Sequence, residues 1–190
     1  PEIIPQNRKK CRINKESYTS KVINNFLVFQ LGWICSAYFH DYRAFLINMA
    51  ILFWLYLVEP WSKRRVKLTL QFVAIGLIID SILYYVGVLY FSGASVIIPL
   101  WLISLWVLFS TTLTVSLSWL MENKYYAMVG GAIFGPLAYW SGQQFEAIVI
   151  VNVYSYIILS LSWLFMMFIF SRLYKKQPNN QITLHRDSLK

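Results

Sequence analysis

Residues 62–91 read SKRRVKLTLQFVAIGLIIDSILYYVGVLYF, a basic segment followed by an apolar one that contains a single acidic residue, Asp80. About 20 apolar residues are needed for an α-helix to cross about 30 Å of hydrocarbon. We therefore interpret 68–91 as a membrane span. The Lys and Arg residues just before it are expected to stay in the cytoplasm.

Five further apolar segments flank this one along the chain. The predicted spans are 22–39, 44–60, 68–91, 96–121, 125–141 and 147–173. Because the connections are short, consecutive helices must be antiparallel neighbours. The predicted fold class is all-α: a polytopic membrane helix bundle of about six transmembrane helices, arranged as three hairpins.

Composition and charge agree with this fold. The chain has 190 residues, of which 58% are hydrophobic and only 13% are charged, whereas soluble domains carry roughly 25% charged residues. The net charge of +9 comes mainly from Lys and Arg before the first span, between the second and third, and after the sixth. This is the positive-inside pattern. It places both termini in the cytoplasm and argues against nucleic-acid binding.

Three regions follow along the chain. Residues 1–21 form a basic cytoplasmic N-terminal segment, 22–173 the six-helix transmembrane domain, and 174–190 a cytoplasmic C-terminal tail. We expect 1–20 and 177–190 to lack helical periodicity and to fray in solvent.

An internal resemblance suggests a duplicated hairpin. Residues 76–87 and 131–142 share Gly, Ile, Tyr, an aromatic residue and Gly at the same offsets, and Ser-Leu-Ser-Trp-Leu occurs at both 116–120 and 160–164. Spans three and four would then be repeated in parallel by spans five and six, as in many transporters. The alternative is coincidence in an aromatic-rich composition. In this alignment Asp80 is replaced by Gly135.

Asp80 is the acid that the prediction places deep in a span. A carboxyl group at that depth must be protonated, paired or beside water, and such a residue is by default a functional candidate. The alternative is a structural hydrogen bond between helices. Polar groups expected near its depth define a candidate ligand cavity. The predicted ligand-binding residues are Gln30, Asp80, Tyr84, Thr111, Thr112 and Tyr139.

Other small and polar residues predict helix packing. Gly131 and Gly135 form a GxxxG motif that permits close approach of helices, and Pro136 is expected to kink its helix. Ser116 belongs to a hydroxyl series on the fourth span that indicates close packing, with a polar cavity as the alternative.

Several enzyme classes are excluded by the residues present. Only two histidines occur, His40 and His185, on opposite sides of the predicted membrane. That excludes His-rich di-iron chemistry and bis-His haem within the bilayer. An aspartyl dyad would need a second intramembrane acid beside Asp80, and none is predicted. The sequence predicts no metal site and no cofactor.

Five stretches carry a resemblance to a known family: 24–30, 79–81, 99–113, 116–120 and 131–140. Over roughly 24–163 the chain is similar to a proteobacterial inner-membrane family known as domain of unknown function 2878. The resemblance implies a bacterial inner-membrane location and brings no activity or catalytic residues. It also implies a genomic association with cyclopropane-fatty-acid-synthase-like methyltransferases and flavin amine-oxidase-like proteins, and hence a link to membrane fatty-acid modification.

Three functional hypotheses follow. The first is a small membrane protein that binds or translocates an apolar, lipid-like molecule, with membrane lipids as its partners. The second is a membrane enzyme or enzyme subunit acting on acyl chains, with Asp80 as acid or base. The third is a scaffold that assembles a membrane-protein partner or a second copy of itself through its GxxxG and hydroxyl faces.

Overall fold

The computed structural model describes residues 6–58, 61–92 and 98–177, and for 6–17 only the backbone. Its elements, in chain order, are α1 (Gln6–Phe39), α2 (Tyr42–Val58), α3 (Lys63–Tyr85), β1 (Leu89–Phe91), α4 (Leu100–Thr114), α5 (Ser118–Met121), α6 (Lys124–Gln144), β2 (Ile148–Ile150) and α7 (Val153–Lys176). The predicted all-helical class is confirmed, with one small two-stranded ribbon added to it.

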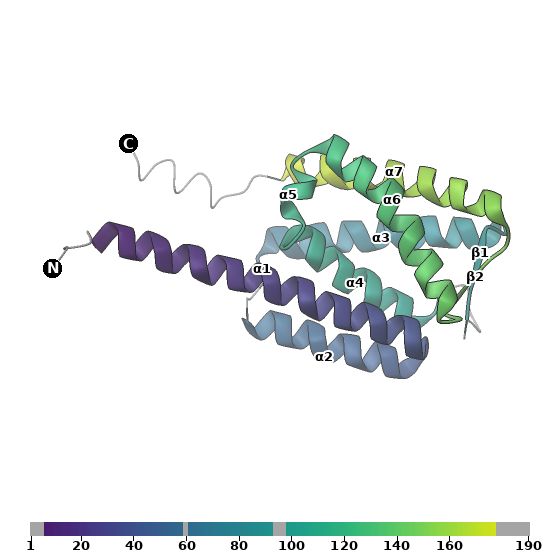
Figure 1. Ribbon diagram of the computed structural model, residues 1–190, viewed down its shortest axis with the longest axis horizontal. Helices are drawn as coiled ribbons and strands as arrows, with labels where there is room; N and C mark the ends of the chain where they lie inside the picture. The colour runs from purple at the N-terminus through teal and green to yellow at the C-terminus, as the bar shows by residue number, and fades with distance from the viewer. Residues whose placement is uncertain (1–5, 59–60, 93–97, 178–190) are drawn as a thin grey trace.

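The long helices lie side by side and run alternately up and down the molecule (Figure 1). α1 packs on α2 and α4, α6 packs on α7, and α3 joins the two groups by packing on α4 and α7. The starts of α3 and α6 and the end of α7 lie at one end of the bundle, and the β1–β2 ribbon lies at the other (Figure 1).

Length and apolarity make the chain a helical membrane protein. Three segments are long and apolar enough to cross a bilayer: Tyr18–Phe39, Lys63–Tyr85 and Val153–Lys176. α2 and α4 are apolar but shorter. Large apolar side chains such as Leu31, Phe53 and Leu70 are more than half exposed, and an outer surface of this kind matches lipid rather than water.

The N-terminal segment differs from its prediction. We expected 1–20 to fray, but the backbone of α1 is helical from Gln6 onward, continuous with the apolar part of the same helix. The segment lacks an apolar stripe but also lacks Pro and Gly after Pro5, so helical propensity has no breaker to stop it. The predicted tail beyond Gln177, the predicted span ends at Pro60 and Val96, and His185 lie outside the described residues.

The third predicted span extends too far and the sixth begins too early, for one reason. α3 ends at Tyr85 because Gly87 adopts a left-handed conformation (φ 73°), and α6 ends at Gln144 with Glu146 in the same region (φ 60°). After each turn the chain becomes a short strand, and β1 pairs with β2 in antiparallel register. The predictions of helix at 86–91 and at 147–152 are therefore wrong, because β-branched and aromatic residues pair there as strands.

The fourth predicted span is broken. α4 stops at Thr114 and α5 begins at Ser118, and Val115 between them leaves the helical region (φ −122°, ψ −82°). Thr111, Thr112 and Thr114 donate their hydroxyl hydrogens to carbonyls three or four residues earlier. Such back-bonding competes with the helical ladder and bends helices, so the hydroxyl series accounts for the break.

The two halves share local structure, but not in the register that the sequence suggested. Each half contains a helix, a left-handed turn, a strand and a helix. Matching the turns aligns Gly76 with Gly135 and Asp80 with Tyr139, one helical turn beyond the predicted alignment. The two Ser-Leu-Ser-Trp-Leu copies also differ, since the first lies across the α4–α5 break and the second inside α7. Duplication of the hairpin stays a prediction.

Candidate functional site: an aromatic pocket

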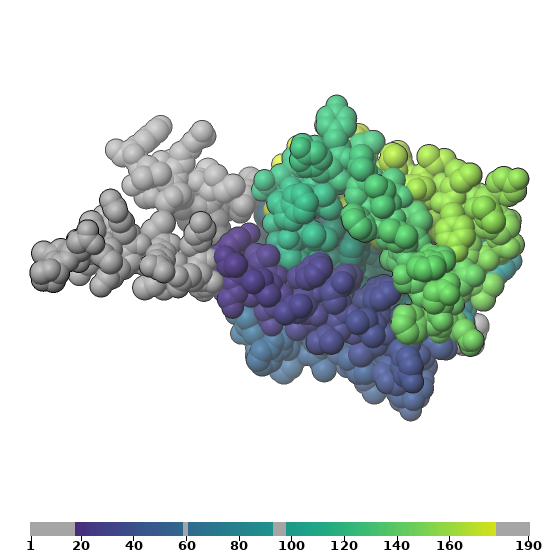
Figure 2. Space-filling view, in the orientation of Figure 1, coloured from purple at the N-terminus to yellow at the C-terminus, as the bar shows by residue number. Residues whose placement is uncertain are grey.

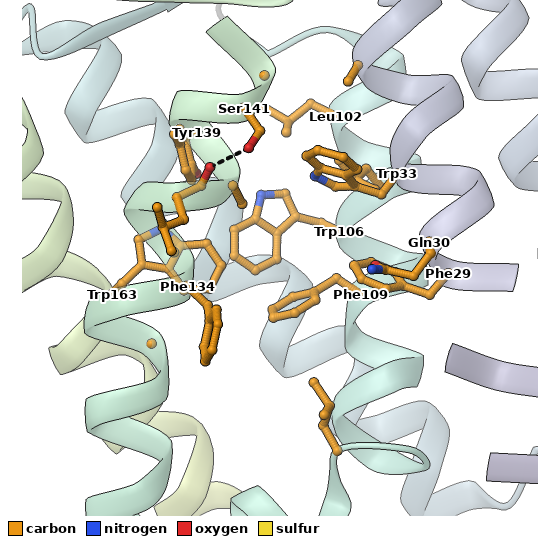
Figure 3. A pocket seen from close by; sticks show the side chains of 18 of the residues that line it. Phe29, Gln30, Trp33, Leu102, Trp106, Phe109, Phe134, Tyr139, Ser141 and Trp163 are labelled. Atoms are coloured by element: carbon orange, nitrogen blue, oxygen red, sulfur yellow. Dashed lines mark hydrogen bonds between the residues drawn. The ribbon is translucent and has the colours of Figure 1, made fainter. Parts of the chain in front are cut away.

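A pocket of about 580 Å³ lies between α1, α4 and α6. Figure 3 shows Gln30 and Trp33 reaching into it from α1, Trp106 and Phe109 from α4, and Phe134 and Tyr139 from α6. In the space-filling view α4 (teal) is set back between α1 (purple) and α6 (green), so this seam is hollowed (Figure 2). Five of the eight tryptophans line it: Trp33, Trp101, Trp106, Trp119 and Trp163.

The floor of the pocket is a set of rings packed on one another. Trp106 stacks on Trp163 with centroids 5.7 Å apart and an interplanar angle of 16°. Phe109 meets both rings edge to face. Each tryptophan is seated on a glycine, since a Cβ at Gly76 would lie 2.6 Å from Trp106 and one at Gly135 would lie 2.2 Å from Trp163. The missing side chains are what let both rings lie flat against the neighbouring helix.

Asp80 holds these rings in place from the side that faces away from the pocket. Its carboxyl group is 1% exposed. Oδ2 accepts a hydrogen bond of 2.7 Å from Trp106 Nε1, and Oδ1 accepts one from the Tyr139 hydroxyl. Both carboxyl oxygens are therefore hydrogen-bonded to neutral donors of the protein. Trp106 and Tyr139 line the pocket, whereas Asp80 does not, so its carboxyl group orients two wall residues from α4 and α6.

Comparison with known proteins places the chain in a family. The model of the family described as protein of unknown function (DUF2878) matches residues 22–169. The chain belongs to the DUF2878 family. No curated protein and no solved structure matches it, so the site of this DUF2878 member is interpreted from its own residues.

The structure brings together only part of the predicted ligand-binding set of this DUF2878 member. Gln30 and Tyr139 line the pocket. Tyr84 lies at the ribbon, with its ring 5.3 Å from that of Tyr90. Thr111 and Thr112 are fully buried, and their hydroxyls donate hydrogen bonds to the Leu108 carbonyl. They lie within the packed bundle rather than in the pocket.

A polar clasp joins α1 to the end of α4. Asn25 donates to Thr111 Oγ1 at 3.4 Å, and Ser116 Oγ donates to Asn25 Oδ1 at 2.8 Å. Ser116, predicted as a packing residue, therefore sits at the α4–α5 break and holds it against α1. The Asn25 amide is thereby satisfied inside the bundle, as a bilayer requires.

Gly131 and Gly135 lie at the contact between α6 and α7. A Cβ at Gly131 would be 2.4 Å from Met167 Cγ, so no larger residue fits without separating the helices. Pro136 lies inside α6, which continues to Gln144. Both glycines also line the pocket, so they take part in the α6–α7 contact and in the pocket wall.

Sequence reasoning missed most of the pocket. Its α4 wall is Trp101, Leu102, Leu105, Trp106 and Phe109, and its α1 wall is Phe26, Phe29, Gln30, Trp33 and Ala37. Both sets recur at helical spacing, so two aromatic stripes with period 3.6 were the available signal. In a membrane span that signal is weak, because apolar residues occupy every face. Asn48, which donates to Ser36 and Ser104, was also missed.

Proposed function

We propose that the chain is an inner-membrane protein whose six long helices all cross the bilayer, with both termini in the cytoplasm. In support, the Lys and Arg residues of the α3 start (Lys63, Arg64, Arg65), of the α6 start (Lys124) and of the α7 end (Lys175) gather at one end of the bundle. That is the positive-inside distribution. The bacterial location rests on the family resemblance.

Within that frame, the function supported best is binding or movement of an apolar, lipid-like molecule in the aromatic pocket. Its volume of about 580 Å³ falls within the roughly 300–1,000 Å³ of small-molecule sites. The rim residues Phe134 and Trp119 are 69% and 60% exposed, so the pocket communicates with the outer surface of the bundle. An apolar molecule in the bilayer would reach it sideways, without crossing water.

The same geometry favours binding over acid–base chemistry by Asp80. Both carboxyl oxygens already accept hydrogen bonds, and the residue lies behind the pocket wall. A general acid or base must come within hydrogen-bond reach of the group it serves. The proposed partners are membrane lipids, and a link to fatty-acid modification rests on the resemblance alone.

Tryptophan fluorescence tests the proposal directly, because five tryptophans line the site. A monoacylglycerol brominated on its chain, titrated into the protein in detergent, should quench emission saturably. Ala138→Phe places a ring inside the pocket and should abolish the saturable part. Ile133→Phe is the matched control, because Ile133 is exposed on the same helix and does not line the pocket.

Equal saturable quenching in all three proteins would place the bound probe elsewhere. Quenching that rises linearly with probe concentration in the wild type would mean that acyl chains contact the tryptophans without a specific binding site. Either result would overturn the proposal.

A further inference from the structure

We propose that the pocket is selective for a neutral molecule with a flat, carbonyl-bearing ring on an apolar tail, the chemistry of a prenylated quinone. This inference rests on the proposed function and names the class of ligand. Three features carry it: the absence of charge in the lining, unpaired hydrogen-bond donors and unpaired aromatic rings.

The first feature is the electrostatic neutrality of the lining. The lining residues include aromatic, aliphatic, Gly, Ser and Gln side chains and no Asp, Glu, Lys, Arg or His. An ionised headgroup in this site would have no countercharge in a medium of low dielectric, which is strongly unfavourable. The pocket therefore disfavours a free fatty acid in its ionised form and a phospholipid headgroup.

The second feature is a surplus of hydrogen-bond donors. Trp33 and the Gln30 amide project into the pocket (Figure 3) and lack a hydrogen-bond partner among the described residues. Trp106 differs, because Asp80 takes up its N–H. Trp101 differs too, because its Nε1 is fully buried behind the lining and out of a ligand's reach. A donor that a ligand covers without supplying an acceptor is unfavourable, and carbonyl oxygens on a ligand would satisfy Trp33 and Gln30.

The third feature separates the rings of the floor from those of the rim. Floor rings such as Trp106, Trp163 and Phe109 pack on one another. Trp33, Trp119 and Phe134 line the pocket, and within the described part of the chain none of them stacks on another ring. Aromatic faces favour a second π-system by offset stacking or edge contact. An acyl chain alone would make no use of this preference.

Calorimetric titration of the purified full-length chain in detergent tests the inference with three probes. A decyl-substituted benzoquinone should bind about tenfold more tightly than monoolein, a neutral ester lipid, because it adds ring contacts that a glycerol ester cannot make. Oleate at pH 8, which is ionised, should bind more weakly than either.

Variants then assign the selectivity to the donors. Trp33→Phe keeps an aromatic ring and removes the N–H, so it should weaken quinone binding about fivefold and leave 1-bromohexadecane binding unchanged. Trp61→Phe is the matched control, because Trp61 Nε1 also has no hydrogen-bond partner but lies outside the pocket. Gln30→Leu, at an exposed position, gives the same test if Trp33→Phe fails to fold.

The outcomes separate the two proposals. Monoolein binding as tightly as the quinone, or equal quinone affinities for Trp33→Phe and Trp61→Phe, would overturn the quinone-class inference and leave a lipid pocket. Unchanged binding of every probe to Ala138→Phe would overturn the pocket itself.

Discussion

Helix α6 borders two interhelical seams, one with α7 and one with α1, and the two are packed differently. Toward α7 the helix is notched by Gly131 and Gly135, and Met167 and Trp163 fill the notches completely. Toward α1 it presents Phe134, whose side chain is 69% exposed, and the space between the helices is the pocket. Phe134 and Gly135 are neighbours in sequence, yet Gly135 packs against a ring of α7 whereas Phe134 faces the open seam.

The difference shows how side-chain size decides whether two membrane helices close on one another. Glycine removes the obstacle to close packing, and a large ring from the partner fills the gap. Large rings on both sides, as in Phe134 and Trp33, hold the helices apart and leave a cavity between them. Asp80 connects the two seams through Trp106, whose N–H it accepts. The Trp106 ring stacks on Trp163 on one side and lines the pocket on the other.

The largest expected effect follows from removing the Asp80 carboxyl group. Asp80→Ala leaves the Trp106 N–H and the Tyr139 hydroxyl buried without an acceptor, and should lower the free energy of unfolding by about 3 kcal/mol. Unfolding of the detergent-solubilised protein by titrated SDS measures it. The tryptophan emission should also shift, since Trp106 loses its partner.

A double-mutant cycle gives the control. Asp80→Asn keeps one acceptor and should cost less than Asp80→Ala, and adding Tyr139→Phe to Asp80→Asn should recover part of the loss. Strictly additive losses would show that the two side chains do not act on one another.

Gly135→Ala should have the next largest effect, because the new methyl group would lie 2.2 Å from Trp163 Cγ. Overpacking of this kind costs about 2 kcal/mol, and it should appear as a lower melting temperature in detergent. Gly130→Ala is the matched control, since its Cβ would meet Leu120 at an ordinary 3.6 Å. Equal melting temperatures for the two variants would contradict the closed α6–α7 seam.

The sequence predicted the helices well and their ends less well. Apolar length located α2 and α6 to within a few residues, because a bilayer requires long apolar helices. It did not separate helix from strand at 86–91, where the left-handed turn at Gly87 ends α3. A left-handed Glu146 at the end of α6 carries no comparable sequence signal, and neither does the non-local pairing of the two strands.

The burial of Asp80 was predictable from the sequence, but its hydrogen-bond partners were not. Asp80 was singled out because a carboxyl group is rare at that depth. Its bonded partners, Trp106 and Tyr139, come from helices far along the chain, and rotation of those helices decides what they face. The tryptophans of the pocket resemble lipid-facing anchors in sequence, so only packing distinguishes them.

Loosening the α1 wall of the open seam should cost less than either change above. Asn25→Leu removes the link to Thr111 and Ser116, and an interhelical hydrogen bond in a membrane is worth about 1 kcal/mol. Amide exchange at the α4–α5 break should rise in parallel. Asn24→Leu, which leaves the clasp in place, should change neither quantity, and an equal response of both variants would contradict the clasp.

The smallest effect on stability is expected at Phe134, although the adjacent Gly135 is expected to show one of the largest. Phe134→Ala removes a ring from the open seam that packs on no other ring in the described part of the chain, so the free energy of unfolding should change by no more than about 0.5 kcal/mol. Probe binding should weaken all the same, because a rim ring is lost. The comparison with Gly135→Ala uses two adjacent positions on one helix and one SDS unfolding assay. A loss of stability at Phe134 as large as at Gly135 would show that the α1–α6 seam is packed as tightly as the α6–α7 seam, and the pocket would then be closed in the protein in solution.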